Sequence, residues 1–444
     1  MRPELGALAG VAGTALVLAG AGCGYRQSAI RVGVLADCAG FFGDAAARDY
    51  SLAAAELPLL ERGARLASKK PSDGVVGAEI GGRRVELVFA CSEWSVLRNL
   101  VEQTRWLVEK QRASIVIGPT WGATEGLILR TVARRYPGVA FLPGVSPAQE
   151  TTLRDPAPNL FRFGPDGVQT SAGLGSYAYH RLGWRRAAVL AFDYSSAWPQ
   201  AAGFIAEFCA LGGRVERVET PSFGTGPTPA IPAGVDGVAL MSQSMQETLT
   251  FAAANGGHGP ELAKRLVLGP GAFDFADPKA FASDGRLLRG VVAASAAPRE
   301  VGAPAWQRFR SAYGRAFPGL VLPGSAAGFP FGLAYYDAME AVAKALEAVR
   351  GNLSGGEPRF RTALAKVRLD SPQGPIRLDP NRQAIVDAYL SRVDVDSRGQ
   401  VALHTLRVVR NVEQTFGGYF GPSTPTLTKS TPACKRRTPP SWAR

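Results

Sequence analysis

The residues best placed for chemistry lie in the stretch G-V-S-P-A, residues 144–148, which follows a predicted strand. Ser146 in this stretch has the setting of the nucleophile elbow of α/β hydrolases, except that the second glycine of that motif is missing. A serine nucleophile needs a histidine base, but His180, His258 and His404 are far apart in the sequence. A hydrolase that uses Ser146 therefore stays only as an alternative.

Other kinds of chemistry have less support. Residues 173–178, G-L-G-S-Y-A, fit the glycine pattern of a dinucleotide site, but they fall inside a helical stretch rather than after a strand. The sequence has no phosphate-binding loop of the Walker type, and no His, Cys or carboxylate cluster has the spacing of a metal site. We therefore predict a protein that is not an enzyme and that uses no cofactor or metal.

The elements expected around these motifs are continuous apolar strands that alternate with amphipathic helices. This alternation predicts an α/β fold with parallel sheets covered on both faces, and 444 residues are enough for two lobes. Segments rich in Pro and Gly interrupt the alternation at 154–167 and 296–304 and are predicted to cross between the lobes. The boundaries that follow are 29–155 and 297–370 for lobe 1, and 165–296 and 376–412 for lobe 2.

The charge of the chain is strongly basic. The net charge is +13, but the excess is diffuse, and no basic stripe with interleaved aromatic residues predicts nucleic-acid binding. Residues 418–444 contain Pro, Thr, Ser, Lys and Arg without an acidic residue. We expect this basic tail to be disordered.

The N-terminus has the pattern of an export signal. Arg2 precedes an apolar run, and L-A-G-A-G-C at residues 18–23 is similar to a bacterial lipobox, although Gly20 stands where Leu is usual. Residues 1–23 are therefore predicted to be a signal peptide with a lipobox, and Cys23 is the predicted lipid attachment site. The protein would then be extracytoplasmic and held to the membrane by a lipid anchor.

Four further cysteines remain. Cys38 and Cys91 each follow an apolar run, so they would meet at one sheet edge, either as a disulfide or as two free thiols. Cys209 is predicted to lie in a helix facing the core, and Cys434 to be a free thiol in the tail.

Loops at the carboxyl ends of parallel strands are the usual place for a ligand in such a fold. The residues of these loops are small, hydroxylated or aromatic, which suits a small polar or zwitterionic molecule. A single aromatic residue among them could equally be part of the rim or core. The candidate ligand contacts are Phe41, Phe42, Trp94, Thr120, Trp121, Gly122, Ala123, Thr124, Val145, Ser146, Tyr194, Trp198 and Gln246.

Several motifs recur in an order that resembles a known family. I-V-I-G-P-T-W-G-A-T, V-A-F-L-P-G-V-S-P-A, N-L-F-R-F-G-P-D-G, V-L-A-F-D-Y-S-S-A-W and A-Y-Y-D-A-M-E-A-V resemble the type I periplasmic binding proteins, in particular the branched-chain amino acid and amide branch that serves ABC importers. The resemblance covers roughly residues 29–410. It implies two Rossmann-like lobes, three hinge crossovers and a ligand cleft that closes between the lobes.

The resemblance also assigns site positions. A serine pair that is common in the loop binding the ligand carboxylate falls on Gly122 and Ala123, and an aromatic position falls on Phe331. The acidic residue that holds the ligand amino group falls near Gln246, with Glu247 beside it. A neutral Gln246 suits an amide or another uncharged ligand, whereas Glu247 turned inward would suit an amino acid.

The function predicted from these features is that of a monomeric substrate-binding lipoprotein of an ABC importer. Its partners would be a small amino acid or amide-like solute and a membrane permease. A ligand-sensing module that signals to a membrane receptor is the alternative from a different class.

Overall fold

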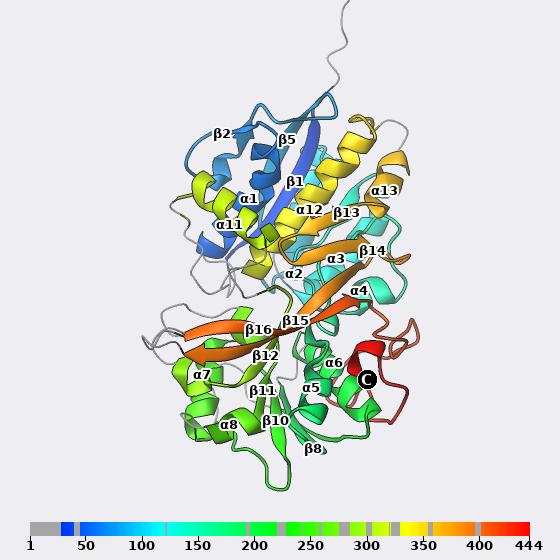
Figure 1. Cartoon of the computed structure of the whole chain (residues 1–444). Helices are drawn as coiled ribbons and strands as arrows, with labels where there is room; N and C mark the ends of the chain where they lie inside the picture. Colours follow the sequence, from blue (N-terminus) through cyan, green and yellow to red (C-terminus); the bar gives the residue numbers. More distant parts are fainter. Residues whose placement is uncertain are drawn as a thin grey trace, which may run out of the picture.

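The computed structural model describes residues 28–39, 45–119, 122–191, 196–219, 228–242, 244–256, 260–274, 285–298, 304–318, 320, 329–353, 358–395 and 401–444. At residues 45–47, 274 and 329–331 only the backbone is described. The described residues form two α/β lobes, one above the other in Figure 1. This confirms the predicted fold class.

The sheet of lobe 1 has five strands in the order β4-β5-β1-β6-β7. Four of them are parallel, and β4 pairs antiparallel at the edge. Apolar residues on both faces of β1 and β6 are buried, as expected of a sheet covered on both sides. The strands are β1 (Ile30–Ala39), β4 (Glu79–Ile80), β5 (Arg83–Glu93), β6 (Ile115–Ile117) and β7 (Ala140–Leu142), and β2 (Arg65–Leu66) and β3 (Val75–Val76) form a separate pair.

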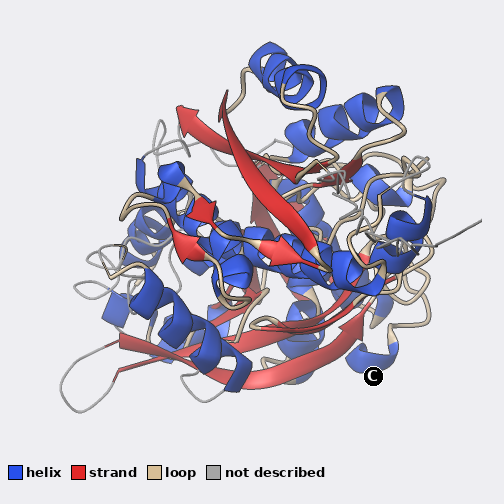
Figure 2. Ribbon diagram, turned by 90° about the horizontal axis from the view of Figure 1, so that it is seen from above, coloured by secondary structure: helices blue, strands red, loops and turns tan. Residues whose placement is uncertain are grey.

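Helices cover both faces of this sheet. One core cluster joins residues of the sheet to α1 (Ala45–Leu60), α11 (Pro304–Ala316), α12 (Phe329–Ala348) and α13 (Pro358–Ala365). A second cluster joins the other face to α2 (Leu97–Arg105), its π-helical continuation Trp106–Lys110, and α3 (Ala123–Arg135). Figure 2 shows helices on both sides of the strands. Segments 30–142 and 304–365 therefore build one lobe although 161 residues separate their ends.

The sheet of lobe 2 continues through the antiparallel strands that return to lobe 1. Its order is β13-β14-β15-β12-β11-β10-β8-β9, and β16 pairs with the other edge of β15. Strands β8 to β12 are parallel, and β13 to β16 are antiparallel. The strands are β8 (Arg186–Ala191), β9 (Arg214–Glu219), β10 (Gly237–Met241), β11 (Leu266–Leu268), β12 (Val292–Ser295), β13 (Arg368–Ser371), β14 (Gly374–Leu378), β15 (Ala384–Val395) and β16 (Val401–Val412).

The helices of lobe 2 pack on two faces. On one face α5 (Leu174–His180) and α6 (Ala197–Ala210) share a core with β8 and β10. On the other face α7 (Met245–Ala254), α8 (Pro260–Arg265) and α9 (Gly271–Asp274) share a second core with the same sheet. A short helix, α4 (Glu150–Leu153), lies in the first crossover, and single 3-10 turns lie at Pro71–Asp73, Gln169–Ser171, Gly285–Leu288 and Ser441–Ala443.

The C-terminal segment differs from the prediction. Residues 418–444 were expected to be disordered, and Cys434 to be free. In the structure Cys434 forms a disulfide with Cys209 on α6, and Phe420 and Leu427 are buried. Both predictions are wrong because a covalent link and a few apolar anchors hold a segment whose composition alone is typical of disorder.

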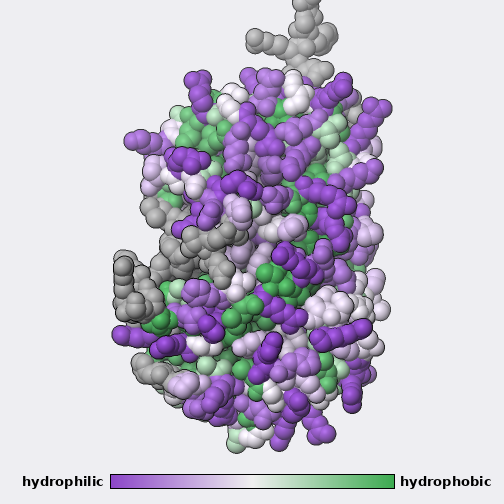
Figure 3. Space-filling view, in the orientation of Figure 1, coloured by the Kyte–Doolittle hydropathy of each residue, from purple (hydrophilic) through white to green (hydrophobic). Residues whose placement is uncertain are grey.

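No described helix is long and apolar enough to cross a membrane. On the face seen in Figure 3, hydrophilic residues predominate and hydrophobic ones appear only in small patches.

Candidate ligand-binding site

The parallel strands of both sheets run toward the opposite lobe. From the carboxyl end of β7 the chain crosses into lobe 2, and from the carboxyl end of β12 it returns to α11 in lobe 1 (Figure 1). Because the strands within each set are parallel, all their carboxyl ends lie on the side that faces the other lobe. Ligands of open α/β sheets bind at this edge. The candidate site therefore consists of the loops on these two facing edges.

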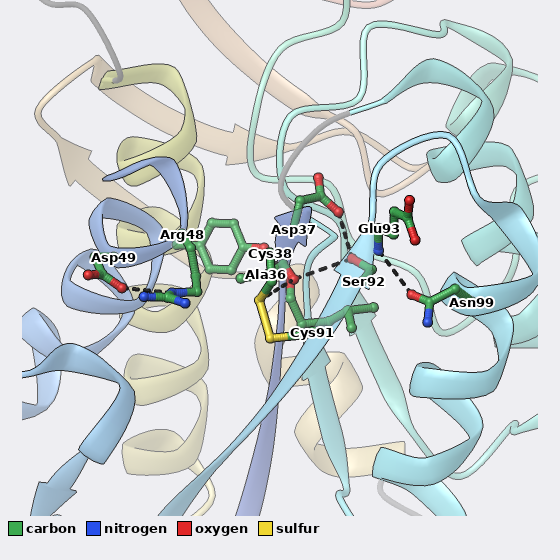
Figure 4. Close-up of a disulfide and its surroundings, with 11 residues drawn as sticks. Ala36, Asp37, Cys38, Arg48, Asp49, Cys91, Ser92, Glu93 and Asn99 are labelled. Atoms are coloured by element: carbon green, nitrogen blue, oxygen red, sulfur yellow. Dashed lines mark hydrogen bonds and ion pairs between the residues drawn. A yellow bond between two sulfur atoms is a disulfide. The ribbon is translucent and has the colours of Figure 1, made fainter. Parts of the chain in front are cut away.

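A disulfide joins the carboxyl ends of β1 and β5 at this edge. The Cα atoms of Cys38 and Cys91 are 5.3 Å apart, and the bond between their sulfurs is one of the two alternatives that the sequence left open. Next to it the Ser92 hydroxyl donates to Asp37 Oδ1 at 2.6 Å, and both residues are buried (Figure 4). The fixed strand ends thus place the acidic Asp37, which the sequence analysis did not single out, at the edge of the site.

The start of α3 is held against the loop that follows β7. The Gly122 N–H donates to the Val145 carbonyl at 3.0 Å. Gly122 has φ 143°, and a Cβ there would lie 1.8 Å from Glu125 Oε2, so both its backbone and its lack of a side chain are needed. Ala123 is buried and Thr124 is exposed. Of the predicted contacts on this loop that are described, Thr124 is the one that presents a side chain to solvent.

Glu125 is a buried carboxylate that the sequence analysis missed. It is 7% exposed, and its Oε1 accepts the Ser95 N–H at 3.3 Å. Burial raises the pKa of Glu125, and hydrogen bonds from its own backbone N–H and that of Ser95 oppose this rise. Helix N-termini attract anions, and here the chain's own carboxylate occupies that position. Its place three residues after the helix-capping Gly122 is the signal that could have identified it.

Ser146 lies in the same region but turns its hydroxyl into the protein. The residue is 2% exposed, and its Oγ is 3.1 Å from Thr151 Oγ1. His180 on α5 and His404 on β16 belong to lobe 2, and His258 lies outside the described residues. No hydrogen bond joins Ser146 to a histidine in the described part of the chain. The geometry gives the hydrolase alternative no support.

Two predicted contacts in lobe 2 lie in different surroundings. Trp198 is 1% exposed and packs in the core between α6 and the sheet, because every face of α6 is buried. Gln246 is exposed on α7, with its amide nitrogen 3.5 Å from Thr250 Oγ1, one turn further along the helix. The Trp198 ring therefore contributes to the core, and the Gln246 amide faces solvent.

Glu247, the neighbour of Gln246, turns the other way. Glu247 is half-buried, and the hydroxyl of Ser242, directly after β10, lies 3.2 Å from its Oε2. Ser244 caps α7 by accepting the Glu247 N–H at 3.1 Å, which fixes the rotation of the first helical turn. The acidic side chain at the carboxyl end of β10 is thus Glu247.

The remaining predicted contacts are described only in part. Trp94, after β5, is half-buried, and its backbone N–H donates to the Ala39 carbonyl at 3.1 Å. Phe331 lies in α12, where only the backbone is described. Phe41, Phe42, Thr120, Trp121 and Tyr194, together with Cys23, lie outside the described residues. Their roles stay predictions.

A buried arginine in the first crossover connects the loops behind the site. Arg162 is fully buried, and its Nη1 donates to the Ser146 and Ala148 carbonyls, both at 2.7 Å. Its Nη2 donates to Thr152 Oγ1 at 2.7 Å. Its Nε donates to the side-chain carbonyl of Gln383, which lies in the third crossover, residues 379–383 between β14 and β15. Arg162 therefore links the loop after β7 to two of the chain segments that join the lobes.

Asp166 compensates the charge of Arg162. Its Oδ2 is 3.8 Å from Arg162 Nη2, and its Oδ1 accepts the N–H groups of Val168 and Gln169, both at 2.9 Å. Burial lowers the pKa of Arg162 to about 10, and Asp166 opposes this change. Since about 10 is far above neutral pH, the guanidinium stays charged and its buried hydrogen bonds are charge-assisted.

No described group of three or more His, Cys, Asp or Glu side chains could hold a metal ion. The described loops at this edge carry the Thr124 hydroxyl and the carboxyl groups of Glu125 and Glu247.

Comparison with known proteins identifies the family. Residues 29–400 match the model of the family described as "Periplasmic binding protein". An ABC transporter substrate-binding protein from Sphaerobacter thermophilus has 23% identity and a TM-score of 0.68, with 87% of this chain and 99% of that chain covered. A solute-binding protein of an ABC transporter from R. palustris, solved with benzoate, has 20% identity and a TM-score of 0.65 over 86% of this chain and 98% of that chain.

A leucine-binding protein from Thermotoga maritima has 17% identity and a TM-score of 0.64 over 86% of this chain and 99% of that chain. At these identities the structures show a shared fold. No match was found among curated proteins. Because the family model spans most of the described residues of both lobes, the chain belongs to the periplasmic binding protein family, whose members bind ligands rather than catalyse reactions.

Proposed function

We propose that this protein is the extracytoplasmic substrate-binding component of an ABC importer and captures a small amino acid or amide-like solute between its lobes. Family membership supports the binding role, and the similar solved structures named above are described as ABC transporter proteins or as a leucine-binding protein. The two facing edges of the sheets support capture by closure of the lobes.

The position of Glu247 is the observation that best supports the proposed class of ligand. Its carboxylate lies beside Ser242 at the carboxyl end of β10, while Gln246 faces solvent. In amino-acid-binding members of the family that the sequence resembles, an acidic residue near this position holds the amino group of the ligand. A half-buried carboxylate is a suitable partner for an ammonium group. We therefore favour a ligand with an ammonium group over a wholly neutral one.

Glu125 supports a second feature of the ligand. Its carboxylate occupies the N-terminus of α3, where the resemblance places the ligand carboxylate. A ligand carboxylate at that point would compete with the Glu125 side chain, which already accepts the Ser95 N–H there. An amide in its place could donate its NH2 group to the Glu125 carboxyl oxygens and accept from the Thr124 hydroxyl. A small amino acid amide or a related amine thus fits both edges.

Ligand binding should depend on Glu247 and not on Gln246. We expect Glu247→Gln to weaken binding at least roughly tenfold, because a buried ammonium would lose its counter-charge. Thermal shifts with amino acids, amino acid amides, short amides, benzoate and 4-hydroxybenzoate would identify the ligand, and titration calorimetry would compare the variants.

Gln246→Ala is the matched control. It changes the residue directly before Glu247, in the same helical turn, but the side chain that it removes is exposed to solvent. It should bind as the parent protein does. Loss of binding in Gln246→Ala with binding retained in Glu247→Gln would contradict the assignment. A response confined to the aromatic acids would contradict the ammonium-bearing ligand while leaving the transport role intact.

The proposed lipid anchor can be tested at Cys23. The wild-type protein should sediment with membranes and carry a diacylglyceryl mass on an N-terminal cysteine. Cys23→Ser should abolish the lipid mass and release the protein into the soluble extracytoplasmic fraction. Mass spectrometry of both fractions measures this, and an unmodified wild-type N-terminus would refute the anchor.

The sensing alternative differs in its membrane partner. Crosslinking in membranes with the ligand bound should capture a permease if the protein serves import. Capture of a receptor without any permease would instead favour the sensing role.

A further inference from the structure

Residues 413–444 follow β16 and pack against parts of both lobes. The family match ends at residue 400, so this segment lies beyond it. Phe416, Phe420 and Leu427 are buried in one cluster with Leu153 of α4 and Ala202 of α6. In Figure 1 the segment, coloured red, lies beside α5 and α6.

The far end of this segment is fixed to lobe 2. Cys434 is disulfide-bonded to Cys209 on α6, across a sequence separation of 225. The Trp442 indole donates to Glu207 Oε1 at 2.6 Å, and the same buried carboxylate accepts the Gly173 N–H at 2.6 Å at the start of α5. The segment therefore belongs to the packing of α5 and α6.

The near end of the segment is fixed to the first crossover. Gln414 is fully buried, and its Nε2 lies 3.1 Å from the Gln149 carbonyl, 2.9 Å from Thr152 Oγ1 and 3.2 Å from Asp166 Oδ2. Gln149 Nε2 in turn donates to the Gln414 carbonyl at 2.9 Å. Arg154 donates to the Thr424 carbonyl further along the segment.

Helix α4, which receives these contacts, is held by lobe 1. Arg130 on α3 donates to the carbonyls of Glu150 and Arg154, at 2.5 and 2.6 Å. Arg134 on α3 also pairs with Asp155, directly after them. A segment anchored to α6 at one end and to α4 at the other thus connects the two lobes.

We propose that residues 413–444 form a strap, a fourth link between the lobes beside the three crossovers, which restrains their relative motion at the hinge. Gln414 is its positioning residue, because it joins α4, which α3 of lobe 1 holds, to Asp166 later in the first crossover. The Cys209–Cys434 disulfide keeps the strap seated on lobe 2.

Hydrogen exchange of the ligand-free, full-length protein tests the strap without reference to any ligand, so the result is independent of the proposed function. In Cys209→Ser/Cys434→Ser the strap should detach more often, and amides of residues 149–169 and 412–414 should exchange roughly tenfold faster or more. Cys38→Ser/Cys91→Ser is the matched control. It removes the other disulfide, and the change should be confined to β1 and β5.

Gln414→Ala removes the contacts of the strap with the first crossover but leaves the disulfide that attaches the strap to lobe 2. It keeps the disulfide, so amides of residues 428–444 should retain their protection while those of 149–169 exchange faster. This variant also decides the question if the double cysteine variant does not fold. The proposal is overturned if exchange at 149–169 stays at the wild-type rate in Gln414→Ala, since the C-terminal segment would then be only an appendage of lobe 2.

Discussion

Replacing Arg162 by alanine is expected to lower the free energy of unfolding by about 3–5 kcal/mol, the usual cost of leaving a buried charge without its partner. The change would remove the donors to the Ser146 and Ala148 carbonyls and leave Asp166 fully buried beside a cavity. Urea denaturation followed by circular dichroism measures the loss. The slope with denaturant should stay unchanged if only stability is affected.

Arg308→Ala provides the control for removal of an arginine from an ion pair. Arg308 and Asp370 are 2.7 Å apart but have 64% and 74% of their side chains exposed. Such a pair contributes about 1 kcal/mol or less. Equal losses in the two variants would show that the buried hydrogen bonds of Arg162 do not hold the crossover.

The sheets could be predicted because their strands are continuous apolar runs. Residues 32–36, 115–117 and 139–142 are apolar on both faces, which occurs where helices cover a parallel sheet on both sides. The hairpin of β13 and β14 could not be predicted in the same way, because its residues S-P-Q-G-P are typical of a loop. Its strands are stabilised by pairing with β15 and by Leu369 and Ile376, which pack in the core of lobe 1.

The order of the C-terminal strap could not be predicted from its sequence. Its composition indicates disorder, and nothing near Cys434 in the sequence points to Cys209, 225 residues away. Order in this segment depends on contacts that only the folded lobes provide, including a covalent one. Local composition cannot reveal such long-range stabilisation.

At the site, the sequence alone did not decide which side chain at the start of α7, Gln246 or Glu247, faces the end of β10. Gln246 and Glu247 are adjacent, so about 100° of helical rotation separates their side chains. Ser244 and Glu247 form an S-x-x-E capping pattern, which places Glu247 in the first turn with its backbone N–H bonded to the Ser244 hydroxyl. That pattern was present in the sequence and would have favoured Glu247 as the residue turned toward the strand end.

Glu56→Gln is expected to stabilise the protein at neutral pH. Glu56 on α1 is fully buried, and neither of its carboxyl oxygens has a hydrogen-bond partner among the described residues. Burial, and to a lesser extent the nearby Asp73, raises the pKa of Glu56 from 4.5 to about 9. The folded state therefore keeps a proton that the unfolded state releases, so stability falls as pH rises from the unfolded pKa toward the folded one.

The loss of stability depends on the difference between the pH and the pKa of Glu56 in the unfolded chain. At about pH 7 the cost is at most about 3.4 kcal/mol, and it falls below about 1 kcal/mol near about pH 5. Glu56→Gln should therefore raise the melting temperature by several degrees at neutral pH but hardly at about pH 5. Glu102→Gln, on the exposed surface of α2, should show no such dependence on pH. Parallel pH profiles for Glu56→Gln and the parent protein would mean that Glu56 is ionised in the folded state, and that the interior near α1 stabilises its charge.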